Sequence, residues 1–324
     1  MNQLLSINPP KETERLINLL QNTIRKKMHR YGAVVGISGG IDSSVILALC
    51  VRAFGPDQIL AVILPEKDSH PETQEIADML VKHYGVDSVI EDITPALEAF
   101  ECYTRRDKAI RKLFPEYDSA AGFTSKIVLP PDPLDNETLN IFSLTIIDPD
   151  NREKTMRLPL PEYLQIVAST NFKQRTRMVY LYHYAELNNY AVAGTTNKDE
   201  YELGFFVKYG DGGVDVEPLA YLYKIQVFQL AEYLGVPEKI RNRPPSTDTY
   251  SAHSTQQEFF YRLPFELLDT LMYALEKSME IGKVAALTGL TEIQVQRMWD
   301  DIQQKKRTTE YLRMEPISIF TDNI

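Results

Sequence analysis

The stretch AVVGISGGIDSSVILALC, residues 33–50, decides the fold. A short run rich in β-branched residues, AVVGI, leads directly into Ser38-Gly39-Gly40, and an apolar helical pattern begins near Asp42. A strand that turns through two glycines into a helix is the first half of a βα unit. The stretch therefore predicts a parallel sheet that carries helices on its faces.

The segments on either side continue this alternation of strands and helices. A helical pattern at residues 11–29 precedes the first strand, and strand-like runs recur at 59–64, 87–92 and 190–194. Helical patterns lie at 42–53, 72–84, 94–101, 170–187 and 223–234. We therefore expect an α/β fold with a doubly wound parallel sheet, in which ligands bind at the carboxyl ends of the strands.

Residues 103–168 interrupt the alternation. A Pro-rich VLPPDPLD stretch precedes two β-like segments, NIFSLTIIDP and KTMRLPLP, which a turn at 149–151 separates. We interpret this as an inserted β-hairpin element at the periphery, with its ends near Cys102 and Ser169 close together. The DPDNRE stretch is a hairpin turn rather than a calcium loop, because Glu153 stands where that loop needs glycine.

The chain after residue 263 is mostly helical. Two apolar helical patterns meet at Thr288 and Gly289, as in a helix-turn-helix. The carboxylates of Asp300 and Asp301 on the second pattern disfavour DNA binding. A packed helical hairpin is therefore the better interpretation. The predicted organisation is thus a first core part at 1–102, an inserted element at 103–168, a second core part at 169–262, and a helical C-terminal region at 263–324.

Composition excludes several classes of protein. The formal net charge of -10 over 324 residues opposes a broad nucleic-acid surface. No apolar run reaches the roughly 18 residues of a membrane span, and no signal sequence is visible, so we expect a cytoplasmic protein without membrane or nucleic-acid partners. The two cysteines lack nearby metal-ligand partners, and Cys50 is expected to be a core residue.

The loop at residues 38–44 has the chemistry of a phosphate site. Two adjacent glycines let the backbone approach an anion, and the helix N-terminus directs N–H groups at it. Asp42 would repel bare phosphate, so a divalent cation between carboxylate and phosphate explains its presence. The alternative is an ordinary helix N-cap. The chain has no G-x-x-x-x-G-K-[ST], so the loop is not a Walker A motif.

Two further segments carry candidate binding residues. NFKQRTRM, residues 171–178, brings Lys173, Arg175 and Arg177 together near one helix start, where cations suit anionic oxygens. GTTNKDEYELGFFVKYGDGGVD, residues 194–215, follows a strand and contains Glu200 and a Gly-rich turn.

These motifs resemble a known superfamily and, within it, one family. Strand-S-G-G-x-D-S-helix is similar to the pyrophosphate loop of N-type ATP pyrophosphatases, whose fold is adenine nucleotide alpha hydrolase-like. The run R-T-R-M, G-T-x-x-x-x-E, G-F-F-x-K-Y-G-D-G-G-x-D and P-L-x-x-L-x-K resembles the NAD synthetase family over residues 11–101 and 169–262.

The resemblance implies roles for particular residues. Contacts to ATP would come from Ser38, Gly39, Gly40, Asp42, Ser43, Ser44, Thr195, Lys224 and Ser246. Deamido-NAD would be bound by Arg175, Lys208 and Asp215, and Mg²⁺ by Asp42 and Glu200. Asp42, Glu200 and Lys224 would form the catalytic group, with Lys224 and Mg²⁺ offsetting charge on the α-phosphate.

The resemblance also implies the reaction and the partners. The implied enzyme is an ammonia-dependent ligase that adenylates deamido-NAD with ATP, releases pyrophosphate, and lets ammonia displace AMP. A homodimer is implied, and a glutaminase, if any, would be a separate subunit. The alternatives are a related ligase that amidates another carboxylate and, less favoured, a tRNA-thiolating enzyme. Lys305-Lys306 is the only counterpart of the family's C-terminal His-Lys pair, and the base for ammonium is not identifiable from the sequence.

Overall fold

The computed structural model describes residues 3–129, 133–134, 142–247, 250–252 and 254–318. The parallel sheet and its helices comprise α1 (Pro9–Leu20), β1 (Ala33–Gly36), α2 (Ile41–Phe54), β2 (Ile59–Ile63), α3 (Pro71–Tyr84), β3 (Asp87–Ile90), α4 (Thr94–Ala99), α5 (Cys102–Leu113), α6 (Leu160–Asn188), β7 (Ala191–Ala193), α7 (Lys198–Leu203), α8 (Lys224–Tyr233) and α9 (Glu238–Arg241). A second sheet holds β4 (Thr124–Val128), β5 (Ser143–Ile147) and β6 (Glu153–Arg157), and β8 (Ser246–Thr247) pairs with β9 (Ser254–Thr255). The C-terminal helices are α10 (Phe265–Glu276), α11 (Ile281–Thr288), α12 (Glu292–Thr308) and α13 (Glu310–Arg313).

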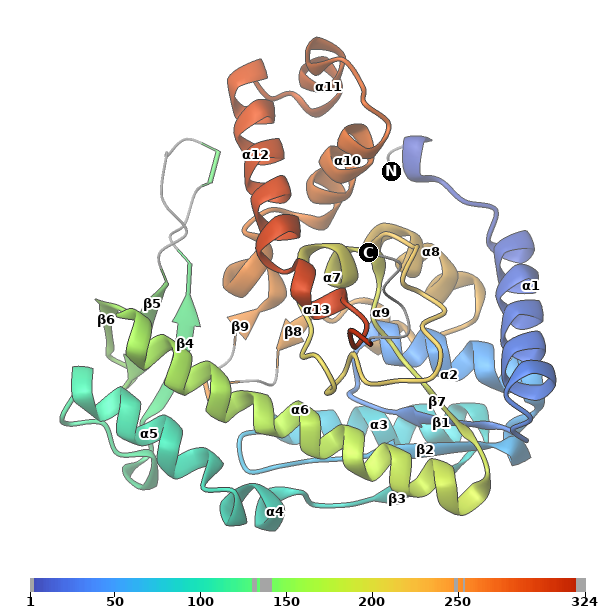
Figure 1. Cartoon of the computed structure of the whole chain (residues 1–324), viewed down its shortest axis with the longest axis horizontal. Coiled ribbons are helices and arrows are strands. Elements are labelled where there is room, and N and C mark those ends of the chain that lie inside the picture. The colour runs from blue at the N-terminus through green and yellow to red at the C-terminus, as the bar shows by residue number, and fades with distance from the viewer. Residues whose placement is uncertain (1–2, 130–132, 135–141, 248–249, 253, 319–324) are drawn as a thin grey trace.

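The main sheet has four parallel strands in the order β3-β2-β1-β7 (Figure 1). Strands β1, β2 and β7 are largely buried on both faces, as expected inside a parallel sheet, whereas the edge strand β3 is largely exposed. Ala33 and Val35 pack into a core with α1, α2 and α8, whereas Val34 points into a second core with α4, α5 and α6. The predicted doubly wound sheet with helices on both faces is therefore confirmed.

The second sheet is antiparallel, in the order β4-β5-β6, and carries its own apolar cluster against α5 and α6. The turn between β5 and β6 is closed by Asp148, whose carboxylate accepts from the backbone N–H groups of Asp150 (2.9 Å) and Arg152 (2.9 Å). This is the predicted hairpin turn.

Helix α6 begins ten residues earlier than the predicted start at 170. Its first turn contains Pro161, at a position where the missing N–H costs nothing because it would have no intrahelical partner. The proposed boundary between 168 and 169 thus lies inside one continuous helix, which crosses the front of the molecule in Figure 1. The ends of the inserted element do lie together, since Cys102 Sγ donates to the Ser169 carbonyl at 3.2 Å.

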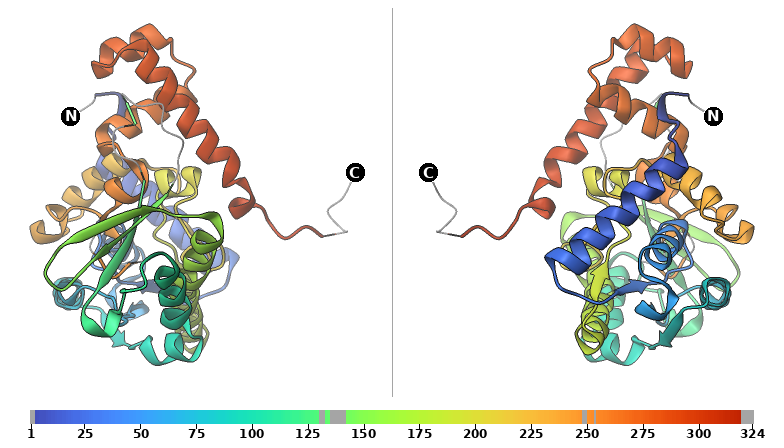
Figure 2. Two further views of the ribbon diagram at one scale, coloured as in Figure 1. Left: turned by 90° about the vertical axis from the view of Figure 1, so that its left-hand side faces the viewer. Right: turned by 90° about the vertical axis from the view of Figure 1, so that its right-hand side faces the viewer.

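The helical C-terminal region stands at one end of the molecule, and its last long helix runs outward toward the C-terminus (Figure 2). Trp299 of α12 donates its indole N–H to Leu271 O of α10 at 3.0 Å, and Val284 and Val295 are fully buried between the helices. Helices α11 and α12 therefore form the packed hairpin that the sequence indicated. Among the described residues, none of the helices combines the length and apolarity that a membrane crossing requires.

Both cysteines are buried. Burial raises the pKa of the Cys50 thiol to about 12 and that of Cys102 to about 11, which disfavours the reactive thiolate. Cys50 thus fits its predicted place in the core of α2.

Candidate active site

A cavity of about 1100 Å³ opens at the carboxyl ends of the main-sheet strands. Residues from Tyr163 to Leu181 of α6 line one side, so the cavity extends along roughly 27 Å of that helix. The loops after β1, β2 and β7 and the end of α12 complete the wall. This is the edge of a parallel sheet at which ligands bind.

The loop after β1 presents a helix N-terminus to the cavity. Gly40 is the N-cap of α2 and has no side chain to cap the helix, and Gly39 has φ +72°, which favours glycine. Ser38 Oγ accepts from the Gly40 N–H at 3.3 Å and lies 3.3 Å from Ser43 Oγ. The arrangement leaves the first turn of α2 directed at the cavity, as an anion site requires.

Beside this loop, four side chains from three helices converge. Lys224, the first residue of α8, is buried, and its Nζ pairs with Asp42 Oδ2. Asn197 donates its amide to Asp42 Oδ1 at 3.1 Å, while its backbone N–H donates to Glu200 Oε2 at 3.1 Å. The predicted catalytic residues Asp42, Glu200 and Lys224 therefore stand together at the cavity wall.

The charges in this group are strongly coupled. Burial raises the pKa of Glu200 to about 8, and the negative charge of Asp42 adds to the effect. Burial lowers the pKa of Lys224, but Asp42 and Glu200 more than offset this, so the Lys224 pKa is raised overall. Lys224 is held as a cation, and a further positive charge would stabilise the two carboxylates.

The side chains of Asp42 and Glu200 fit a magnesium ion that is bound jointly by the protein and by a nucleotide. Asp42 and Glu200 supply two carboxylates, and Mg²⁺ in nucleotide sites takes one or two carboxylates together with phosphate oxygens and water. The raised pKa of Glu200 marks a place where anionic charge lacks full compensation. In the described ranges, no group of three or more His, Cys, Asp or Glu side chains has the arrangement of a metal site.

Other cations face the cavity. Arg177 lines it and donates Nε to the Leu64 carbonyl at the end of β2 (3.3 Å), and Arg243 lines it next to Gly39. The predicted ATP contact Thr195 also lies on the wall, after β7. These cations give the cavity wall a local positive charge that complements a polyphosphate, although the chain as a whole is acidic.

The predicted deamido-NAD contacts Arg175 and Lys208 lie on the same wall and are connected. Arg175 Nε donates to the Lys208 carbonyl at 3.3 Å. Lys208 Nζ donates to the carbonyls of Tyr311 (2.9 Å) and Met314 (2.7 Å), next to the end of α13. The end of the helical region therefore covers one side of the cavity, where Lys305 faces inward. Lys306 instead forms an ion pair with Glu202.

Two predicted residues with described side chains are not brought to the cavity wall. Ser44 is fully buried and donates its hydroxyl to the Gly40 carbonyl at 2.8 Å. Asp215 accepts from the Val192 N–H (2.8 Å) and the Tyr182 hydroxyl (3.1 Å) beside a separate cavity of about 340 Å³. The side chain of Ser246 lies outside the described part of the chain. The ligand contacts of these residues stay predictions.

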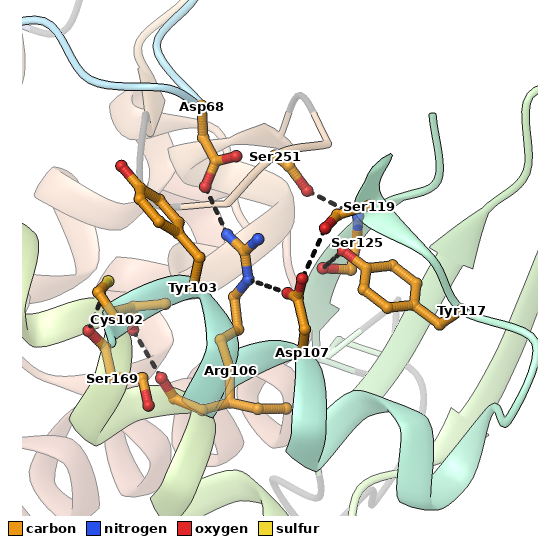
Figure 3. Close-up of polar contacts among 12 residues, drawn as sticks. Asp68, Cys102, Tyr103, Arg106, Asp107, Tyr117, Ser119, Ser125, Ser169 and Ser251 are labelled. Carbon is orange, nitrogen blue, oxygen red and sulfur yellow. Dashed lines mark hydrogen bonds and ion pairs between the residues drawn. The ribbon is translucent and has the colours of Figure 1, made fainter. Parts of the chain in front are cut away.

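The basic cluster predicted on α6 is divided. Lys173 is buried and pairs with Glu66 Oε1 (3.0 Å) and Asp68 Oδ2 (2.7 Å), so a buried ion network already neutralises it. Figure 3 shows the rest of this network, in which Arg106 of α5 lies between Asp68 and Asp107. Lys173 therefore shapes the cavity wall rather than offering a free cation.

The inserted element is not peripheral, contrary to expectation. Leu129, Phe142, Tyr163 and Val167, all within 103–168, line the cavity. Phe142 stacks on Tyr163 with ring centroids 4.7 Å apart. An apolar, aromatic end of the cavity thus comes from this element.

Sequence reasoning missed several residues of the site. Asn197 caps α7 in a reciprocal capping box with Glu200, a pattern that N-x-x-E before a helix would have revealed. Asp211 lines the cavity and accepts from the Val207 N–H at 2.7 Å, and burial raises its pKa to about 6. Arg243 had no sequence signal, because only the folded chain brings it to Gly39.

The fold and the cavity define a class: a parallel α/β protein with a helix-terminus anion loop and a cationic cavity at the carboxyl edge of its sheet. Known proteins with similar sequences make this more specific. The family model described as NAD synthase matches residues 12–116 and 140–316. The chain is 45% identical over 314 residues to an NH(3)-dependent NAD(+) synthetase of Mesorhizobium japonicum, covering 97% of this chain and 98% of that protein. The chain belongs to the NAD synthase family.

Solved structures agree on the fold. An NMN synthetase from Francisella tularensis aligns over 98% of this chain and 100% of its own, with a TM-score of 0.66 and 23% identity. An NH3-dependent NAD synthetase from Campylobacter jejuni, in complex with nitrate, aligns over 97% and 100%, with a TM-score of 0.61 and 23% identity.

Proposed function

We propose that this chain is an NH3-dependent NAD synthetase, which uses ATP to amidate the nicotinic acid carboxylate of deamido-NAD. The near full-length identity of 45% to a protein of that name supports the assignment. One structural observation carries it: Asp42, Glu200 and Lys224 converge beside a glycine loop at the N-terminus of α2. That constellation suits a nucleotide whose phosphate charge must be offset at the reacting phosphorus.

The reaction has two steps. A carboxylate oxygen of deamido-NAD attacks the α-phosphorus of ATP, the bond to the β-phosphate oxygen breaks, and pyrophosphate leaves. Ammonia then attacks the acyl carbon, the bond to AMP breaks, and a proton passes from nitrogen to solvent. No protein nucleophile takes part, so the chain acts by positioning and by stabilising charge.

Particular residues have defined tasks in this scheme. The N–H groups at the start of α2, with Ser38 and Ser43, bind phosphate oxygens. Lys224, held as a cation by Asp42, offsets charge that develops on the α-phosphate. Asp42 and Glu200 would hold Mg²⁺, which neutralises phosphate charge when bound.

The acyl substrate would lie along α6, away from the glycine loop. Arg175 and Lys208 border that part of the cavity, and their cations suit the pyrophosphate bridge of a dinucleotide. The length of the cavity, roughly 27 Å along α6, leaves room for a second nucleotide beside ATP. Ammonia is the proposed nitrogen donor and a homodimer the proposed assembly.

The test is product analysis with purified chain, ATP, MgCl2, ammonium chloride and deamido-NAD. Mass spectrometry should detect NAD, AMP and pyrophosphate in equal amounts. Nicotinic acid mononucleotide, supplied in parallel, tests the alternative of a related ligase. Preferential amidation of the mononucleotide would replace the proposed substrate, and ADP formed in step with NAD would rule out adenylation.

A further inference from the structure

Two buried carboxyl groups lie behind Lys224, on the side away from the cavity. Asp199 of α7 and Asp269 of α10 are both fully buried, with 0% exposure. Asp199 Oδ2 accepts from the Lys224 N–H at 3.2 Å, and Asp269 Oδ2 accepts from the Ile225 N–H at 2.9 Å. The two acids thus bind the first two backbone N–H groups of α8.

These hydrogen bonds matter because of where α8 begins. The first N–H groups of a helix have no intrahelical partner, and the cap residue Tyr223 offers no side-chain oxygen that could satisfy both. Lys224 is itself a cation at the positive end of a helix, an unfavourable place that its ion pair with Asp42 offsets. Asp199 and Asp269 therefore determine where α8 starts and which way its first side chain extends.

The two acids also link α8 to two other parts of the chain, α7 and the helical C-terminal region. Asp199 follows Asn197 in the first turn of α7, and Asn197 Oδ1 accepts from its N–H at 3.0 Å. The same Asn197 binds Asp42. Asp269 comes from the helical C-terminal region, so that region takes part in fixing the geometry between Lys224 and Asp42.

We infer that Asp269 is a positioning residue for the amidation reaction, acting through the Ile225 amide to hold Lys224 against Asp42. The inference rests on the proposed function for its reaction, but its geometry concerns this chain alone. Asp269 is fully buried and does not line the cavity. Its substitution should therefore act on the charge-stabilising step through Lys224, rather than through lost contacts to deamido-NAD.

Three variants separate positioning from simple stability. Asp269→Asn keeps an oxygen that can accept from the Ile225 N–H, whereas Asp269→Leu has a similar size and no acceptor. Thr270→Val is the matched control, since Thr270 is buried next in sequence and donates its hydroxyl to the Glu266 carbonyl of its own helix. Each is compared with the wild type for kcat, for KM of both substrates, and for ATP affinity by calorimetry.

We expect Asp269→Leu to lower kcat by roughly 100-fold, the scale of a displacement of about 1 Å at a reacting group. ATP binding should weaken, while KM for deamido-NAD changes little. Asp269→Asn should retain kcat within about threefold, and Thr270→Val should match the wild type. If Asp269→Leu does not fold, Asp269→Ser replaces it, because the serine hydroxyl is too short to reach the Ile225 amide. The expected order of kcat among the variants stays the same.

Two results would overturn the inference. One is a folded Asp269→Leu enzyme with wild-type kcat and ATP affinity, and the other is an Asp269→Asn enzyme as impaired as Asp269→Leu. The proposed function fails separately, if the wild type makes no NAD from deamido-NAD. In that case the order of ATP affinities still decides whether Asp269 positions Lys224.

Discussion

Replacing Arg106 by Met should destabilise the fold strongly, because it removes the central cation of the buried network in Figure 3. Arg106 is 1% exposed and pairs with Asp68 and with Asp107 (2.9 Å from Nε to Oδ1). Asp68 would keep Lys173, but Asp107 would keep only the Ser119 hydroxyl among its described partners (2.6 Å). A buried carboxylate would thus lose its counter-charge.

Removal of one partner from a buried ion pair costs about 3–5 kcal/mol. An m value for urea of roughly 4 kcal/mol/M, above the small-protein range because m grows with chain length, converts this loss into a midpoint lowered by about 1 M. The neighbouring Arg105→Ala is the control. Arg105 is 53% exposed and pairs with Glu101 four residues earlier, an interaction of about 0.3–0.5 kcal/mol.

The assay is urea unfolding, followed by circular dichroism, of the wild type and both variants. Adding Asp107→Asn to Arg106→Met should recover part of the loss, because it removes the uncompensated carboxylate. Equal midpoints for Arg106→Met and Arg105→Ala would refute the reasoning. The network would then contribute little to the stability of the fold. Deletion of the inserted element, which carries Arg106 and Asp107, would not be costly on account of this network.

Three further predictions concern activity and pH. Asp42→Asn and Glu200→Gln should each reduce turnover to near background, and a fully active Glu200→Gln enzyme would remove Glu200 from the metal site. The urea midpoint should stay close to that of the wild type in Glu200→Gln but fall in Asp42→Asn, because the buried Lys224 loses its ion-pair partner. Ammonium should support NAD formation and glutamine should not, and glutamine-dependent synthesis by the purified chain alone would contradict this. Burial raises the pKa of Asp68, but Lys173 and Arg106 lower it overall, below its ordinary value of 3.8. Its stabilising effect is therefore complete above that pH and is lost as the pH falls through the folded-state pKa, so the urea midpoint should decline below pH 4. The decline should be smaller in Arg106→Met, because the pKa of Asp68 is lowered less when Arg106 is absent. A midpoint that stays constant down to pH 3 would contradict this.

The sheet and its helices were predictable because each carries a local signal. The buried strands around AVVGI are short apolar runs, and each is followed by a helical pattern within a few residues. The start of α6 was missed because LPLPEY was interpreted as the end of a strand, although Pro161 also suits the first turn of a helix. The short strand β4, Thr124–Val128, lacks a flanking signal strong enough to identify it.

The site was predictable where a motif holds its residues together in sequence. Asp42 and Glu200 belong to such motifs, and the structure brings them together with Lys224. The ion network was not predictable, because it joins a loop and two helices that are distant in sequence: Asp68 lies 38 residues from Arg106 and 105 residues from Lys173. Lys173 and Arg175 looked like one basic cluster, but two residues along a helix are separated by about 200° around its axis. One therefore faces buried carboxylates, and the other remains exposed.

The cavity wall takes residues from Gly36 to Leu312, almost the whole span of the described chain. A ribosome makes these residues in order, and domains fold as their sequence emerges. The glycine loop is made early, but the end of α12 and α13, which complete the wall, are made near the end of the chain. A nascent or prematurely terminated chain therefore holds an incomplete pocket, so unfinished molecules should not sequester or hydrolyse ATP in the cell.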